Sequence, residues 1–234
     1  GVGHYEPLRH YSEVHLLLEP LPSGSGLQIT SDCPVDFLAL PWQKMVLNCL
    51  DEMEVPGVLT GSPLTDIKIT LIAGKAHIKH TEGGDFRQAT LRALRQGLRS
   101  VSCQLLEPIY QFRMELPSGQ LSRAMFDLER MQAQSSITQT REETVILEGT
   151  APVAKMRNYQ AELTAYTHGL GRLTCTFDGY QPCADQEAVI EALGYDCDGD
   201  LDFPADSIFC SHGAGFLVRY DEVSEHMHLE AQWH

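Results

Sequence analysis

The chain has 234 residues, of which 43% are hydrophobic, and a formal charge of −15 at pH 7. This length suits one large domain or two ordinary ones, and the pattern of elements described below favours two. The longest apolar runs, such as residues 14–18, are far shorter than the roughly 20 residues that a membrane-spanning helix needs. No signal peptide opens the chain, so we expect a soluble protein without membrane contact.

The cysteine content indicates a reducing compartment. Seven cysteines without the close, regular spacing of a disulfide framework favour free thiols in the cytoplasm. The chain starts at Gly1 with no initiator methionine, which suggests a piece of a longer protein.

Charge is distributed unevenly along the sequence. Residues 181–234 contain twelve Asp or Glu and one Arg, a net charge of −11, which leaves −4 for the first 180 residues. The segment 75–100 is the most basic, with six Lys or Arg against two acids. We therefore predict an acidic C-terminal extension over residues 181–234 and a local basic face on the body that precedes it.

The first part of the chain alternates strand and helix patterns. Strands are predicted over residues 11–19, 26–31 and 65–72, and an amphipathic helix over residues 41–54. A loop from Lys75 to Gly84 then leads into a second helix that begins near Asp85. The apolar stripe of that helix predicts that its arginines point largely outward: Arg87, Arg92, Arg95 and Arg99.

A second set of elements begins near Glu107-Pro108. The pattern predicts, in order, a strand over 110–116, a helix over 121–134, a hairpin of strands 136–140 and 144–149, a helix over 153–167 and a strand over 172–180. This β-α-β-β-α-β order is the ferredoxin-like motif. In the acidic extension, a helix from Asp185 to Leu193 stops at Gly194, and a strand over 216–220 precedes a helix capped at Asp221.

Five sequence blocks together resemble the last two domains of translational GTPases. The blocks are EPLPSGSGLQ (19–28), GVLTGSPLTDIKITL (57–71), GGDFRQA (83–89), LLEPIYQFRMELP (105–117) and GRLTCTFDGY (171–180). Their order is similar to that in elongation factor G, and more similar still to that in the tetracycline-resistance ribosomal protection proteins. The resemblance covers about residues 5–180.

The resemblance implies an α+β fold with two α/β-sandwich domains. Residues 1–107 would form a ribosomal protein S5 domain 2-like domain, similar to domain IV of elongation factor G, and residues 108–180 a ferredoxin-like domain, similar to domain V. The nucleotide-binding domain, with its GTP and Mg, would lie upstream, because the P-loop motif GxxxxGK[ST] is absent here. We therefore expect a cytoplasmic monomer with no cofactor and no catalytic activity in this piece.

In these families the first of the two domains reaches into the decoding region of the ribosome through loops at its end, and the loop Lys75–Gly84 falls on one of them. Phosphate-dense RNA attracts cations through counterion release, and unpaired bases stack on His and Arg planes. The loop Cys33–Leu40 resembles another contacting loop. The implied contacts with rRNA are Lys75, His77, Ile78, Lys79, His80, Thr81, Arg87, Arg92, Tyr5, His10 and Tyr11.

The resemblance leaves the biological step open. Elongation factor G also has a histidine at the place of His77, whereas ribosomal protection proteins carry a Tyr-Ser-Pro-Val run about where this chain has His77-Ile78-Lys79-His80. Tetracycline protection, translocation and ribosome rescue therefore stand as alternatives. Without the resemblance, the basic residues of the helix would be interpreted as an ordinary solvent-exposed face.

A metal-binding interaction module in the acidic extension is a further alternative. The candidate ligands include Cys183, Cys210, His212 and His228, but no CxxC pair accompanies them. The aspartates of residues 196–206 lack the spacing of an EF-hand loop, and the sequence SHGAG at 211–215 does not match GxSxG. We therefore predict no metal site and no independent active site.

Overall fold

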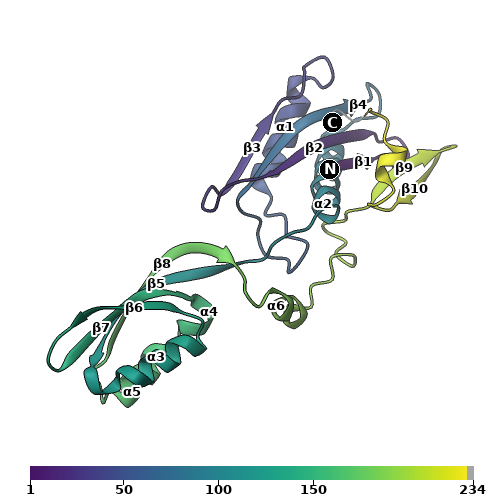
Figure 1. Cartoon of the computed structure of the whole chain (residues 1–234). Helices are drawn as coiled ribbons and strands as arrows, with labels where there is room; N and C mark the ends of the chain where they lie inside the picture. Colours follow the sequence, from purple (N-terminus) through teal and green to yellow (C-terminus); the bar gives the residue numbers. More distant parts are fainter. Residues whose placement is uncertain (231–234) are drawn as a thin grey trace. The chain divides into compact units, whose positions relative to one another are not determined.

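The computed structural model describes residues 1–230, which form two compact units (Figure 1). Unit 1 contains residues 1–103 together with the described residues from Asp185 onward, and unit 2 is Gln104–Ala184. The acidic segment after residue 184 therefore belongs to the same unit as the N-terminal domain, a relation that the sequence left open. No helix among the described residues is long and apolar enough to cross a membrane.

Unit 1 is built on a mixed six-stranded sheet in the order β10-β9-β1-β2-β4-β3. The strands are β1 (Val2–Tyr5), β2 (Ser12–Pro20), β3 (Leu27–Ser31), β4 (Ile67–Ala76), β9 (Ser207–Ser211) and β10 (Ala214–Val218). Helices α1 (Leu40–Glu52) and α2 (Gly83–Arg99) pack on this sheet around one apolar core, which includes Val14, Leu16, Leu71 and Phe86.

Strand β1 is enclosed between α2 and the C-terminal segment. A Cβ atom at Gly3 would lie 2.0 Å from the carbonyl oxygen of Ala89, so glycine is needed for β1 to pass directly against α2. Val2 instead joins an apolar cluster with Phe209, Val218 and Val223 of the C-terminal segment. Alternate residues of a strand face opposite sides, so one side of β1 meets the helix and the other meets the end of the chain.

Unit 2 is a four-stranded antiparallel sheet with helices packed on it. The strands are β5 (Leu106–Pro117), β6 (Gln134–Thr140), β7 (Thr144–Pro152) and β8 (Arg172–Pro182), in the order β6-β7-β5-β8. After a 3-10 turn, η1 (Ser118–Gln120), come α3 (Leu121–Arg130), α4 (Val153–Met156) and α5 (Tyr159–Tyr166). The first and last strands of the motif are neighbours at β5 and β8, as the predicted ferredoxin-like fold requires.

Most predicted elements are confirmed, with two kinds of difference. The helix predicted over 153–167 is two helices, α4 and α5, and the helix predicted to reach residue 134 ends at Arg130, because Gln132 adopts a left-handed conformation with φ of 58°. Strands β1 and β9 were not predicted. Each is only four or five residues long, too short to display a clear alternation.

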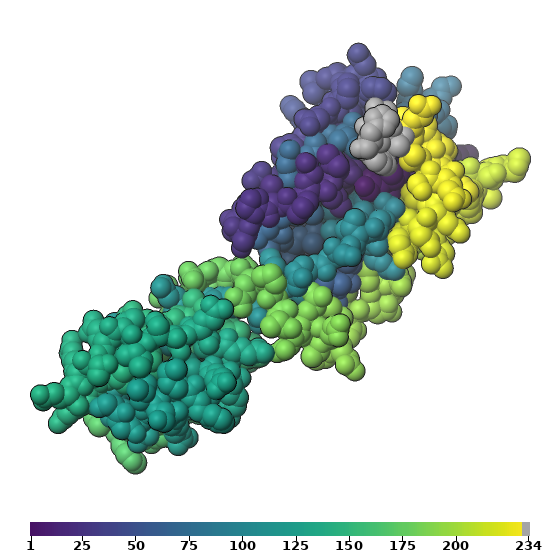
Figure 2. Space-filling model, in the orientation of Figure 1, coloured from purple at the N-terminus to yellow at the C-terminus, as the bar shows by residue number. Residues whose placement is uncertain are grey.

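The C-terminal segment extends the sheet of unit 1 and covers part of it. After α6 (Gln186–Leu193), strand β9 pairs with β1 in parallel through Tyr5 and Ile208, and β10 returns antiparallel to β9. The short helix α7 (Val223–His226) follows. Figure 2 shows the end of this segment, in yellow, directly against the N-terminal strands and the helix coloured teal. The acidic segment is thus a folded layer of unit 1.

Helix α2 holds this layer through Arg95, which the sequence pattern wrongly predicted to point outward. The side chain is fully buried. Its guanidinium donates to the carbonyl oxygens of Pro56 at 2.6 Å and Phe203 at 2.9 Å, and to the hydroxyl of Tyr195 at 3.0 Å. The same group lies 2.9 Å from Sγ of Cys197. Because the carbonyl group of Phe203 is part of the backbone of the acidic segment, Arg95 fixes the path of that segment.

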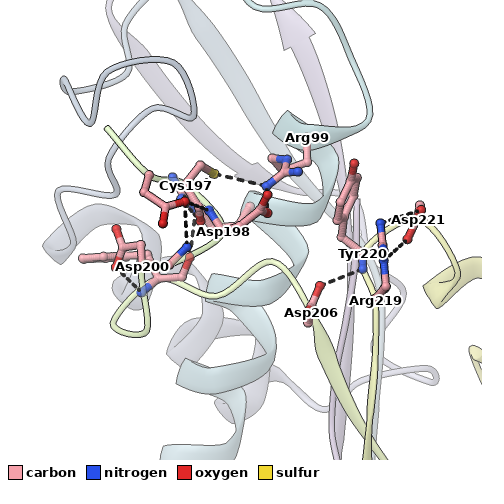
Figure 3. A network of polar contacts seen from close by, with 12 residues as sticks. Arg99, Cys197, Asp198, Asp200, Asp206, Arg219, Tyr220 and Asp221 are labelled. Carbon is pink, nitrogen blue, oxygen red and sulfur yellow. Dashed lines mark hydrogen bonds and ion pairs between the residues drawn. The ribbon is translucent and has the colours of Figure 1, made fainter. Parts of the chain in front are cut away.

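A second cation of α2 binds the acidic segment near the surface (Figure 3). Arg99 pairs with Asp198 and stacks over the ring of Tyr220, with the guanidinium carbon 4.2 Å from the ring centroid. The hydrogen bond from Arg99 lowers the pKa of Asp198 below its ordinary value. Tyr220 is held in turn, because its backbone N–H donates to Asp206 at 2.9 Å. Part of the basic helix therefore neutralises the chain's own acids.

We predict that the chain ended at Ala184 retains unit 2 and loses much of the stability of unit 1. Truncation exposes the cluster around Val2 and removes the partners of Arg95. In calorimetry the transition of unit 1 should fall by roughly 10 °C or more, while that of unit 2 stays in place. An unchanged unit 1 transition would contradict the packing described here.

We also predict unequal roles for the two arginines. Arg95→Met leaves two buried carbonyl groups without their donor and should lower the free energy of unfolding of unit 1 by about 3 kcal/mol. Arg99→Met, at a partly exposed pair, should cost about 1 kcal/mol. Urea unfolding followed by tryptophan fluorescence measures both, since unit 2 contains no tryptophan. Equal losses for the two variants would argue against Arg95 as the main anchor.

Candidate nucleic-acid interface

The strand registers bring four connections to one end of the unit 1 sheet. Tyr5 of β1 pairs with Ser12 of β2, and Ser12 pairs with Ala76 at the end of β4. Strand β3 runs parallel to β4, and β9 runs parallel to β1, so their last residues lie at the same end. We call this end the tip; it consists of residues 6–11, 32–39 and 212–213 and of residues 75–82, which are the end of β4 and the loop that follows it.

The loop between β4 and α2 is a tight turn with internal hydrogen bonds. The backbone N–H groups of His80 and Thr81 donate to the carbonyl oxygen of His77 at 3.1 and 3.0 Å. The N–H of His77 donates to the hydroxyl of Thr81 at 2.6 Å, and that hydroxyl donates to the carbonyl oxygen of Tyr11, also at 2.6 Å. Thr81 therefore connects this loop to the turn that ends at Tyr11, and it fixes the conformation of the loop.

The outer surface of the tip combines cations with exposed apolar groups. Ile78, in the middle of the loop, has an exposed fraction of 104%, and Lys75 and Lys79 beside it are exposed. Apolar residues are also exposed on the neighbouring tip connections: Leu8, Val35 and Phe37. Clustered exposed apolar groups mark contact surfaces, and lysines suit a phosphate-rich partner.

Histidine rings line a hollow of about 280 Å³ beside the loop. The rings of His77 and His80 stack with centroids 4.6 Å apart and planes 24° apart. The backbone N–H of Lys79 donates to Nδ1 of His77 at 3.2 Å, which holds the ring in place. The hollow is lined by Glu6, Pro7, Leu8, Arg9, His10, Tyr11, His77, His80 and Cys210. Flat rings of this kind are surfaces on which unpaired bases stack.

The N-terminus of α2 is satisfied within the chain. The backbone N–H of Glu82 donates to a carboxylate oxygen of Asp85 at 2.8 Å, completing a capping box. His10 Nδ1 lies 2.8 Å from the other carboxylate oxygen of Asp85, and Ser12 donates to its carbonyl oxygen at 2.8 Å. The positive end of this helix therefore already faces a carboxylate, and the cations of the tip must come from side chains.

The structure places the predicted contact residues in three settings. Those exposed on the tip or on the first turns of α2 are Lys75, His77, Ile78, Lys79, His80 and Arg87. Those that hold the tip together are His10, Tyr11 and Thr81. Arg92, predicted to point outward, is instead buried and lies 5.2 Å from the ring centroid of Tyr5. This pair packs inside unit 1 because the C-terminal segment covers that side of α2.

A buried carboxylate beneath the tip was missed by the sequence patterns. Glu13 accepts hydrogen bonds from His4 Nδ1 at 2.7 Å and His15 Nε2 at 2.8 Å, and from the backbone N–H groups of His228 and Leu229, each at 2.8 Å. Burial alone would raise the pKa of Glu13, but these bonds outweigh it and hold the pKa well below its ordinary value. The polar run Ser12-Glu13 followed by His15 in a strand was the available signal.

The proposed zinc ligands of the extension do not assemble as one group. Cys183 lies in unit 2, and His212 is exposed in the turn between β9 and β10. Cys210 borders the hollow, and His228 lies against Tyr11, with the Tyr11 hydroxyl 3.0 Å from its Nδ1. His228 instead approaches two residues of the N-terminal part, His4 and Glu6.

Two protein-family models match the chain one after the other. The model "Elongation factor G, domain IV" matches residues 4–102, and the model "Elongation factor G C-terminus" matches residues 104–190. Together they account for most of the chain and coincide closely with the N-terminal part of unit 1 and with unit 2.

Individual relatives agree with these models. Tetracycline resistance protein TetO of Campylobacter jejuni is 34% identical over 176 residues, covering 75% of this chain and 27% of that protein. Tetracycline resistance protein TetP of Clostridium perfringens is 29% identical over 171 residues, covering 73% and 26%. Elongation factor G 1 of Synechocystis sp. is 29% identical over 185 residues, covering 78% and 27%. The chain thus spans about a quarter of the length of these relatives.

A solved structure shares the fold. A crystal structure of a protein from Thermus thermophilus matches with a TM-score of 0.73 at 21% identity, over 84% of this chain and 30% of that chain. The α+β architecture predicted from the sequence is therefore confirmed. The two models and the relatives show that the chain belongs to the family of elongation factor G and the tetracycline-resistance ribosomal protection proteins, and corresponds to their domain IV and C-terminal domain.

Proposed function

We propose that this chain is the ribosome-contacting C-terminal module of a translation-factor GTPase and that its tip meets rRNA in the decoding region. The observation that carries the proposal is the end of β4 and the loop after it, where Lys75, Ile78 and Lys79 are exposed beside a turn fixed by Thr81. A pre-ordered loop loses little conformational freedom when it binds. Its lysines suit phosphates, and its stacked histidines suit unpaired bases.

The module itself would carry no catalytic step. GTP and Mg would be bound by an upstream domain of the same protein, since the P-loop motif is absent from these residues. The contribution of the module is then positional: a rigid sheet carries the tip loops, and unit 2 would supply further contacts. The protein would act in the cytoplasm as a monomer.

Within this family we favour protection of the ribosome from tetracycline over translocation. TetO and TetP, with 34% and 29% identity, are named tetracycline resistance proteins. The tip residues His77-Ile78-Lys79-His80 differ from the run expected in protection proteins, so the tip is the part to test. A role in translocation or in ribosome rescue would use the same surface to bind the ribosome, but it would not confer resistance to tetracycline.

We predict that Lys75→Ala with Lys79→Ala weakens sedimentation of the chain with vacant ribosomes. Each lost phosphate contact should reduce the slope of log affinity against log salt by roughly 0.7–0.9, so the pair should lower it by about 1.5. Ile78→Asp should also weaken binding. The melting temperature should stay the same, because exposed loop substitutions usually change stability by under about 0.5 kcal/mol.

Lys68→Ala is the matched control for this experiment. Lys68 lies on the same strand as Lys75 but at its other end, roughly 23 Å away at about 3.3 Å per residue. The control should retain the affinity and salt slope of the unaltered chain. Equal losses for Lys68→Ala and Lys75→Ala would mean that the protein binds by net charge and not through the tip.

We predict that a TetO chimera, in which this chain replaces the matching C-terminal part, keeps resistance to tetracycline in sensitive bacteria. The same chimera with Lys75→Ala and Lys79→Ala should lose most of it, because the tip would no longer hold the ribosome. Growth at graded drug concentration is the measurement, with expression checked by immunoblot. A well-expressed chimera without any resistance would contradict the assignment to tetracycline protection. It would not contradict the proposal that the tip binds the ribosome.

A further inference from the structure

Three potential metal ligands from opposite ends of the chain converge beside the hollow of the tip. They are His4 on β1, Glu6 just after it and His228 in the C-terminal segment, and one ligand atom of each lies within 4.8 Å of the others. Nε2 of His4 and a carboxylate oxygen of Glu6 are already 3.1 Å apart. Ligands of a tetrahedral zinc ion lie about 3.3 Å apart for bonds of about 2.0 Å, so the ligand atoms would need to approach one another by at most about 1.5 Å.

The ring of His4 is oriented as a metal ligand usually is. Its Nδ1 donates to the buried carboxylate of Glu13 at 2.7 Å, and Nε2, which contacts the carboxylate of Glu6 at 3.1 Å, is the nitrogen that would bind the ion. Zinc-binding histidines characteristically donate their other ring N–H to a carboxylate, which fixes the tautomer and raises the basicity of the ligand. Phe209 stacks on the same ring with centroids 4.0 Å apart and prevents it from turning.

His228 is held in a corresponding way. Its Nδ1 lies 3.0 Å from the hydroxyl of Tyr11, so the tautomer that donates to Tyr11 leaves Nε2 available to an ion. The backbone N–H of His228 donates to Glu13, the same carboxylate that orients His4. One buried acid therefore fixes two of the three ligands.

The third ligand and an open coordination position lie on the side of the hollow. The backbone N–H of Cys210 donates to the Glu6 carboxylate at 3.3 Å. Glu6, Tyr11 and Cys210 all line the hollow, which gives an ion a path of entry. A water molecule can occupy the fourth position of a tetrahedral site.

We propose that unit 1 binds one zinc ion through His4, Glu6 and His228. Two imidazole nitrogens and one carboxylate form a donor set that zinc accepts and that calcium and magnesium, which take mostly oxygen ligands, do not favour. The ion joins the C-terminal segment to the first strand, so its binding energy adds to the folding energy of the tip. This inference concerns the stability of unit 1 and is independent of ribosome binding.

The test is a titration of the purified 234-residue chain with zinc chloride after chelator treatment and dialysis. We expect one zinc ion per chain by calorimetry and a higher melting temperature of the unit 1 transition. Cobalt(II) should give the intense visible absorption bands of a four-coordinate ion, a signature that loose surface binding lacks. Absence of saturable one-to-one zinc binding would overturn the proposal.

Substitutions identify the ligands. His228→Gln and, separately, Glu6→Gln should each weaken zinc binding by at least about 100-fold, and Tyr11→Phe should weaken it by roughly 10-fold through loss of the partner of His228. The matched control is His212→Asn, which removes an exposed histidine of the same segment, at a left-handed position that asparagine tolerates.

Folding is checked separately from binding. Without metal, each variant should give the circular dichroism spectrum of the unaltered chain and a similar melting temperature. Zinc should raise that temperature in the unaltered chain and in the control, but not in His228→Gln or Glu6→Gln. If one ligand variant fails to fold, the other carries the test. Unchanged affinity in a folded His228→Gln or Glu6→Gln variant, or an equal loss in His212→Asn, would show that zinc binds elsewhere.

Discussion

The buried guanidinium of Arg95 is the interaction on which the arrangement of unit 1 depends. A charge taken out of water costs several kcal/mol unless hydrogen bonds replace its hydration. Helix α2 cannot provide those bonds to Arg95 itself; they come from Pro56, Phe203, Tyr195 and Cys197. Three of these four residues belong to the C-terminal segment. The helix that carries the tip loop at its start therefore gains stability from that segment.

This arrangement divides the cations of α2 and of the segment just before it between two tasks. Arg95 and Arg99, in the last turns, meet the acidic segment of the same chain, whereas Lys75 and Lys79, before the first turn, are exposed on the tip. Opposite charges in contact inside unit 1 cancel locally. The net charge of −15 therefore says little about the tip, since charges more than about 8 Å away are screened at physiological salt.

Sequence patterns predicted those elements whose buried face is visible as a periodic pattern within their own residues. Helix α1, helix α2 and the central strands each bury one face, and that face is visible in the sequence. Strand β1 is four residues long and covered on both sides, so it carries no alternation. Arg95 has the spacing of a solvent-facing residue on α2. Three of its four partners, Tyr195 among them, lie about one hundred residues further along the chain, and no pattern within the helix could reveal them.

In the candidate site, too, sequence patterns predicted the local features but not the contacts between distant residues. The position of residues 77–81 at the end of the sheet could be predicted, because a short loop between a strand and a helix must lie there. Lys75, predicted to begin the loop, is instead part of β4. The support beneath the loop could not be predicted, because Glu13 receives its hydrogen bonds from both ends of the chain, from His4 and from the backbone of His228 and Leu229. An ionised carboxylate with no exposure requires those donors. Displacing the C-terminal segment would leave Glu13 without half of its bonds, directly below Tyr11, which holds Thr81 of the tip loop. The acidic segment is therefore a structural part of the tip of unit 1.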